Sequence, residues 1–205
     1  MDKDKKVGIV GYWYATNYGS VITYYALYKI IEEFGLEPIL IDRPEAWTDR
    51  EGMDSISRIF LNNHCLISDS YQWDEIDKIN NLCDTFVVGS DQVWTKDAMH
   101  IMKNMFFLNF AEKSKRKIAY APSFGYDNIN ISGDDLNQAS KLIHEFNAIS
   151  VREDSGRKIL AEKFMVDADQ SVDPVFLLDI DYYNAIAAES KCIVTDDYIL
   201  AYILV

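Results

Sequence analysis

The chain has 205 residues, 49% of them apolar and 26% charged, which is typical of one sizeable globular domain. Its formal net charge of −13 argues against a nucleic-acid partner, because phosphate binding needs a basic stripe. The single basic cluster, residues 113–117, is expected to be a solvated edge. No apolar run approaches the roughly 18 residues of a membrane span, and three widely spaced cysteines favour a reducing compartment, so we expect a cytoplasmic protein.

The beginning of the chain predicts a strand, a helix and a second strand. Residues 7–11 are a short apolar run that ends in glycine, and residues 12–20 read as a loop. Residues 21–34 carry apolar side chains at helical spacing up to Gly35, a common helix terminator. Residues 37–41 form the next apolar run. A strand–helix–strand unit this short predicts parallel strands.

The same alternation continues along the chain and predicts an α/β fold with a doubly wound, mainly parallel sheet, that is, a Rossmann-like lobe. Residues 44–81 are less regular, and we expect them to form a helical segment with long loops. Further strands are expected at residues 85–88, 117–120, 148–151 and 171–172, and further helices at residues 134–146, 154–163 and 181–188.

The last residues, 198–205, form a strongly apolar run without a cap or polar tail. A strand this apolar is expected to lie inside a sheet. We therefore expect one lobe over residues 1–190, with residues 191–205 as the start of a second lobe that has been cut. The alternative is that the run completes the sheet of the first lobe.

Polar, turn-forming residues follow several predicted strands, where ligands gather in folds of this class. In the first loop, Asn17 and Gly19 tolerate left-handed backbone angles, and Ser20 is a plausible cap for the next helix. The exposed amides of such a helix end suit a phosphate, a carboxylate or a sugar hydroxyl. An ordinary turn with aromatic packing is an equal alternative.

The loop after residues 85–88 has the sequence GSDQVW. Gly89 permits a close approach, and Ser90, Asp91 and Gln92 offer hydroxyl, carboxylate and amide groups. Trp94 could stack on a pyranose ring, with a buried tryptophan as the alternative.

Two later strand ends carry further candidates. The turn that contains Ser123, Phe124 and Gly125 follows one strand, and Arg152 and Glu153 follow another. Arg152 is expected either to pair with Glu153 or to hold a phosphate or carboxylate. Glycine-rich dinucleotide, Walker and metalloprotease motifs are not found, and no metal site is expected.

Five segments, in their order and spacing, resemble the polysaccharide pyruvyl transferase family. In chain order they are a first strand leading into GYWYATNYGSVITYYAL, then VVGSDQVW, IAYAPSFG, ISVREDSG and SVDPVFLL. They span residues 7–178, and residues 44–81 match no motif of the family.

The resemblance implies a two-lobed fold like that of GT-B glycosyltransferases, with the active site between the lobes. It implies transfer of the pyruvyl group of phosphoenolpyruvate, the donor substrate, onto two hydroxyls of a hexose in a bacterial exopolysaccharide or capsule precursor, free or lipid-linked. The product is a cyclic ketal, and no cofactor or metal is implied. The arginine and histidine that the family uses for the donor lie in the carboxy-terminal lobe. This lobe is therefore expected to hold the acceptor, and to be inactive alone.

The resemblance carries a set of cleft residues onto this chain. Asp91 is the preferred hydroxyl-binding or basic group, because it lies at a strand end. The expected substrate-binding residues are Asn17, Tyr18, Gly19, Ser20, Gly89, Ser90, Gln92, Trp94, Ser123, Phe124, Gly125, Arg152 and Glu153.

Two other functions remain open at this point. One is a glycosyltransferase of the same two-lobed shape that uses a nucleotide sugar. The other is a non-catalytic carbohydrate-binding module that kept the fold.

Overall fold

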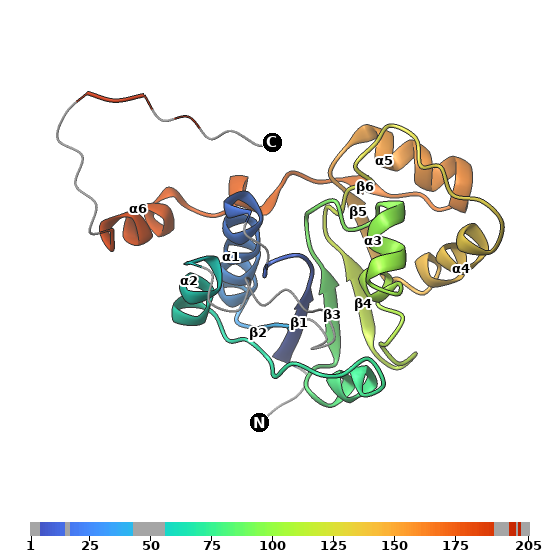
Figure 1. The fold of residues 1–205 in the computed structure, drawn as a ribbon, viewed down its shortest axis with the longest axis horizontal. Helices are drawn as coiled ribbons and strands as arrows, with labels where there is room; N and C mark the ends of the chain where they lie inside the picture. Colours follow the sequence, from blue (N-terminus) through green and yellow to red (C-terminus); the bar gives the residue numbers. More distant parts are fainter. Residues whose placement is uncertain (1–4, 15–16, 43–55, 191–196, 200, 202–205) are drawn as a thin grey trace.

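The computed structural model describes residues 5–14, 17–42, 56–190, 197–199 and 201 (Figure 1). Within these residues, six parallel strands form one sheet in the order β2-β1-β3-β4-β5-β6. This confirms the α/β fold with a Rossmann-like parallel sheet. The strands are β1 (Lys6–Val10), β2 (Glu37–Leu40), β3 (Thr85–Val88), β4 (Arg116–Ala119), β5 (Ala148–Val151) and β6 (Asp169–Gln170).

Helices connect the strands and cover the sheet. In Figure 1, α1 and α2 lie toward the β2 side of the sheet, and α4 and α5 lie toward the β5–β6 side. The α-helices are α1 (Tyr18–Glu33), α2 (Ile56–His64), α3 (Lys96–Ile101), α4 (Gly133–Ile143), α5 (Asp154–Ile159) and α6 (Ile180–Ala188). Shorter helical turns are η3 (Ile76–Asn81), η4 (Met105–Phe107), η5 (Leu160–Phe164) and η6 (Pro174–Phe176).

Several expected boundaries differ from those in the structure. The last strand lies two residues earlier than expected, at β6, and the helix α3 was not predicted at all. Of the irregular region, residues 56–64 form α2, whereas residues 44–55 lie outside the described residues. No helix among the described residues has the length and apolar character that a bilayer crossing requires.

The expected boundary at residue 190 and most of the apolar run at residues 198–205 also fall outside the described residues. The described residues there, 197–199 and 201, belong to neither a helix nor a strand.

The cap of α1 is Asn17, so the prediction that Ser20 caps this helix is wrong. Asn17 has extended backbone angles, and its side-chain oxygen accepts a hydrogen bond from the amide of Gly19 at 2.9 Å. An asparagine in this position satisfies one of the amides left free at a helix start. The helix consequently begins three residues earlier than expected, and Ser20 lies in its first turn with its side chain buried.

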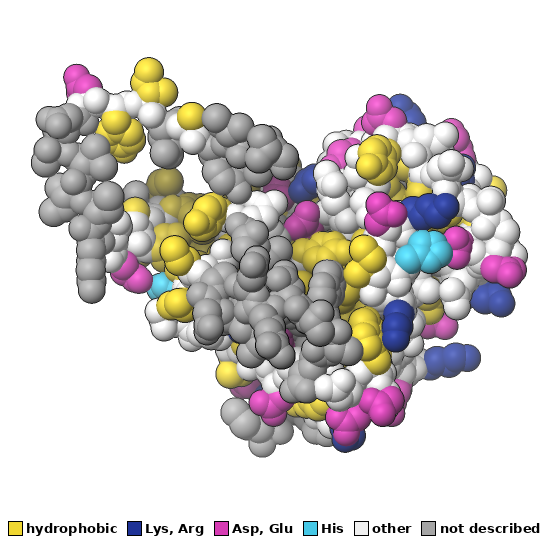
Figure 2. All heavy atoms as spheres, viewed as in Figure 1, with side chains coloured by type: hydrophobic (Ala, Val, Ile, Leu, Met, Phe, Trp, Pro, Cys, Tyr) yellow, Lys and Arg dark blue, Asp and Glu magenta, His cyan; other side chains and the backbone are white. Residues whose placement is uncertain are grey.

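The basic cluster at residues 113–117 is not a uniformly solvated edge. Lys117 lies in the central strand β4, its side chain is 2% exposed, and its amine pairs with Glu145 at 2.5 Å. Lys115 is largely buried too and pairs with Asp84. On the described part of the face in Figure 2, basic side chains are interspersed with acidic ones.

The two faces of the sheet are covered by different segments. Side chains alternate along β3, so Phe86 points to the face opposite Gly89. The ring of Phe86 meets Phe110, just after η4, with ring centroids 5.1 Å apart. Gly89 instead lies beneath Tyr24 and Leu27 of α1. The sheet therefore has α1 on one face and the segment around η4 on the other, as a doubly wound fold requires.

Tyr24 sets how closely α1 approaches the ends of β1 and β3. Its side chain is fully buried, and it covers the positions where Gly11 and Gly89 would carry a Cβ atom. Such an atom on Gly11 would lie 1.6 Å from the phenol oxygen, and one on Gly89 would lie 2.7 Å from the ring. Only glycine at both strand ends leaves room for this ring.

We expect the Gly11→Ala substitution to lower the free energy of unfolding by about 1–3 kcal/mol, because the methyl group must displace Tyr24 or the helix. Denaturant unfolding measures the loss. Gly19→Ala is the control, since its new carbon would contact only the Asn17 side-chain oxygen, at 3.2 Å. Its effect should stay within about 0.5 kcal/mol. Equal losses in the two variants would contradict the close approach of Tyr24.

Candidate functional site

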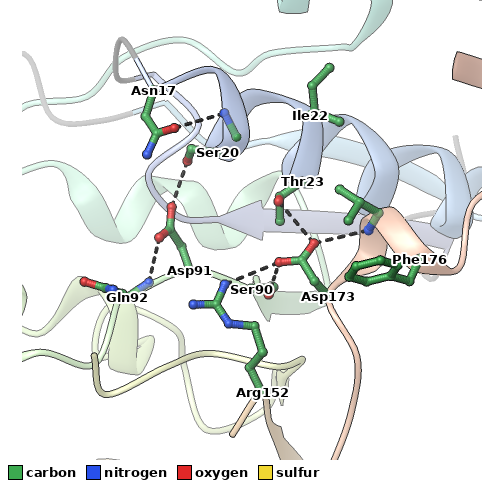
Figure 3. A pocket seen from close by; sticks show the side chains of 12 residues that line it. Asn17, Ser20, Ile22, Thr23, Ser90, Asp91, Gln92, Arg152, Asp173 and Phe176 are labelled. Carbon is green, nitrogen blue, oxygen red and sulfur yellow. Dashed lines mark hydrogen bonds and ion pairs between the residues drawn. The ribbon is translucent and has the colours of Figure 1, made fainter. Parts of the chain in front are cut away.

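A hollow opens at the carboxyl end of the sheet, between the ends of β1 and β3, where the strand order reverses. The connection after β1 leads to β2 on one side, whereas the connection after β3 leads to β4 on the other side. Ligands bind at such switch points in open α/β sheets. The hollow has a volume of about 650 Å³, within the range of ligand pockets. Its lining residues, most of which Figure 3 labels, are Asn17, Gly19, Ser20, Ile22, Thr23, Ser90, Asp91, Gln92, Arg152, Asp173, Val175 and Phe176.

Asp91 reaches the hollow from the loop after β3. One carboxylate oxygen accepts a hydrogen bond from the amide of Gln92 at 2.7 Å, and the other accepts one from the hydroxyl of Ser20 at 2.8 Å. The Ser20 hydroxyl also lies 2.7 Å from the carbonyl oxygen of Tyr12. A serine has a single proton to donate, so these two acceptors share it. Asp91 is thus held in place while keeping lone pairs for a ligand hydroxyl.

Two tyrosines beside Asp91 stay neutral at physiological pH. Burial, followed by the charges of Asp91 and Asp97, raises the pKa of Tyr12 to about 12. Burial and the charge of Asp91 also raise the pKa of Tyr24 well above its usual value. Neither phenol lines the hollow, and both keep their proton near neutral pH.

Asp173 joins four segments of the fold at one side of the hollow (Figure 3). One of its oxygens accepts hydrogen bonds from Thr23 of α1 at 3.1 Å and from the amide of Val175 at 3.2 Å. The other accepts from Ser90 at 2.9 Å and from Arg152 at 3.3 Å. Sequence reasoning missed this residue as part of the site. The available signal was an Asp-Pro pair directly after a short strand.

Arg152 forms ion pairs within the protein. Its Nε donates to Glu153 at 2.9 Å, and one terminal nitrogen donates to Asp173. Burial acts to lower the pKa of Arg152, but the hydrogen bonds and charges of Glu153 and Asp173 outweigh burial and raise it. Of the two interpretations of Arg152, the ion pair is the one present. Among its described residues, the lining thus has two carboxylates, those of Asp91 and Asp173, for one guanidinium.

The structure divides the expected site residues into groups. Seven of them line the hollow together: Asn17, Gly19, Ser20, Ser90, Asp91, Gln92 and Arg152. Ser123, Phe124, Gly125 and Glu153 line a smaller neighbouring hollow of about 110 Å³, which shares Gln92. Tyr18 is exposed and does not line the main hollow, and Gly89 is buried beneath α1.

Trp94 is a core residue, so the expectation that it stacks on a sugar is not met. Its side chain is 0% exposed, its indole nitrogen donates to the carbonyl of Phe106 at 3.0 Å, and its ring stacks on Phe107. The aromatic side chain at the hollow is instead Phe176, which is 79% exposed. Residue type alone did not distinguish a buried ring from an exposed one.

Across the described part of the chain, no group of three histidine, cysteine or acidic side chains is arranged to hold a metal ion.

Comparison with profiles of known protein families matches residues 17–205 to Polysaccharide pyruvyl transferase. The matched region begins at the cap of α1 and includes every residue that lines the hollow. A search of curated proteins found no matching relative.

We expect Asp173→Ala to lower the free energy of unfolding by about 2–4 kcal/mol, because it leaves Ser90, Thr23 and Arg152 without their shared acceptor. Asp179→Ala is the matched control. Asp179 also caps a helix by accepting from the amide two residues later, but it is exposed, so about 1 kcal/mol is expected. Denaturant unfolding compares the two, and equal losses would show that Asp173 acts only as a cap.

Proposed function

The chain belongs to the polysaccharide pyruvyl transferase family, and we propose that it holds the acceptor hexose while pyruvyl is transferred from phosphoenolpyruvate to two of its hydroxyls. The product is a cyclic ketal on a bacterial cell-surface polysaccharide precursor, made in the cytoplasm. The observation that carries the proposal is the position of Asp91 at the switch point, hydrogen-bonded to Ser20 and facing the hollow.

The proposed reaction needs a group that takes and returns protons. The enol carbon C3 of phosphoenolpyruvate gains a proton, the first sugar oxygen bonds to C2, and the C2–O bond to phosphate breaks. The second sugar oxygen then bonds to C2. The two hydroxyl protons balance the equation, since one is equivalent to the proton gained at C3 and the other leaves on hydrogen phosphate. One carboxylate that accepts hydroxyl protons, Asp91, meets the basic requirement at the acceptor.

The charges of the hollow fit a sugar better than the donor. Phosphoenolpyruvate carries a phosphate and a carboxylate, and both require cationic partners. Among the described residues of the lining, the only cationic side chain is Arg152, which is already paired with Glu153 and Asp173. Carboxylates, hydroxyls and amides instead suit the hydroxyls of a hexose. We therefore propose that a second lobe supplies the donor site, and that this lobe alone does not complete the reaction.

The test uses the protein with its entire coding sequence, phosphoenolpyruvate and a panel of hexosides. Phosphate release that depends on the acceptor, together with a product heavier by one pyruvate less one water, is the expected result. Turnover with a nucleotide sugar but none with phosphoenolpyruvate would favour a glycosyltransferase. Acceptor binding without turnover of either donor would favour a carbohydrate-binding module.

We expect Asp91→Asn to lower kcat about 10²- to 10⁴-fold, because the amide does not accept a proton from the attacking hydroxyl. The assay is phosphate release at saturating acceptor. Asp167→Asn is the matched control, since Asp167 also accepts from the amide of the next residue but lies outside the hollow. Unchanged turnover in Asp91→Asn would exclude the basic role.

A further inference from the structure

A second large hollow lies beyond Gln92, along the same edge of the sheet. Its volume is about 460 Å³, and its lining includes Gln92, Tyr126, Asn128 and Asn130. The small hollow of about 110 Å³ also has Gln92 and Tyr126 in its wall, and Gln92 lines the main hollow as well. The three hollows therefore adjoin one another, with Gln92 common to all of them.

The loop after β4 forms one wall of this second hollow. Gly125 has a φ of +77°, and its amide donates to the Ser123 hydroxyl at 2.9 Å, which turns the chain sharply. A Cβ atom on Gly125 would lie 2.9 Å from the Thr95 methyl group and 3.3 Å from the Gln92 side-chain oxygen. The loop thus packs directly on these two residues. The next residue, Tyr126, projects from the turn and is 72% exposed.

Residues 128–131 alternate between exposed and buried positions. Ile129 and Ile131 are buried in the core, whereas Asn128 and Asn130 are exposed. This alternation anchors the loop and directs the two amide side chains away from the core. The wall is therefore fixed by packing while its polar groups remain accessible.

The chemistry of this lining matches a neutral polyol. Within the described residues, the side chains of Gln92, Tyr126, Asn128 and Asn130 form no side-chain hydrogen bonds, so their donors and acceptors face solvent. Amides bind vicinal hydroxyls through a donor and an acceptor, and an exposed aromatic ring can cover the apolar face of a pyranose. The charges of Lys96 and Asp97 in this lining cancel, which gives no preference for an anion.

We propose that this second hollow is a subsite for a further sugar of the acceptor, with Tyr126 as its stacking platform. The acceptor is then an oligosaccharide chain that runs from the main hollow past Gln92 to Tyr126. The proposal rests on the proposed function, because the main hollow is taken as the site of the reacting hexose. Phe176 and Tyr126 are the exposed aromatic rings of the two larger hollows.

The experiment compares two acceptors in the phosphate-release assay: the methyl hexoside that the panel identifies, and a short oligosaccharide ending in the same hexose. Tyr126→Ala should raise KM for the oligosaccharide about 3- to 10-fold, leaving its kcat and both constants for the methyl hexoside unchanged. Tyr126→Phe keeps the ring and should retain most of the affinity. Phe34→Ala, an equally exposed aromatic at the opposite end of α1, is the control.

Three results separate the possible failures. An unchanged KM for the oligosaccharide in Tyr126→Ala, or equal changes for both acceptors, would overturn the subsite. If the parent protein transfers pyruvyl to no acceptor, the proposed function fails. Calorimetric binding of short oligosaccharides that end in each hexose of the panel, to the parent and Tyr126→Ala proteins, then decides the subsite. Weaker binding only in Tyr126→Ala supports it, and equal binding overturns it. Melting temperatures establish that the variants are folded.

Discussion

The packing of Tyr24 against the glycines that end β1 and β3 is the contact on which the site depends. Ser20, Thr23 and Tyr24 are three and four residues apart, so they share one face of α1. When the ring fits against Gly11 and Gly89, the same face places Ser20 against Asp91 and Thr23 against Asp173. A bulkier residue at either strand end would move this face and separate both pairs. The site is thus a consequence of how closely one helix approaches the sheet.

Asp173 fixes the opposite side of the hollow relative to α1. Its four hydrogen bonds come from α1, the loop after β3, the end of β5 and η6. The pairing with Asp173 also offsets the charge of Arg152. Besides Arg152, the hollow is lined by carboxylate, hydroxyl and amide groups and by an exposed phenyl ring. These groups favour hydroxyl-bearing ligands over phosphates, in agreement with the proposed acceptor role.

The position of individual residues at the hollow was foreseeable where the signal was local. Asp91 and Ser90 directly follow a clear apolar strand, and strand ends of a parallel sheet share one edge, so their proximity to Asn17 was foreseeable. Asp173 lies 150 residues from Thr23, and no periodicity links the two. The expectation that Trp94 stacks on a sugar was not met for a different reason. The loop that contains Trp94 was located correctly, but η4 and the segment between α4 and β5 bring Phe107 and Phe146 against the indole and bury it.

The sequence by itself determined the parallel α/β class, the positions of most strands and the family, because apolar runs, helical spacing and motif order are properties of neighbouring residues. Only the tertiary structure decided the strand order β2-β1-β3-β4-β5-β6, and hence that the loops after β1 and β3 meet. It also decided which aromatic rings are buried and that Arg152 pairs with Asp173. These features arise from packing between segments far apart in the chain, which local patterns do not specify.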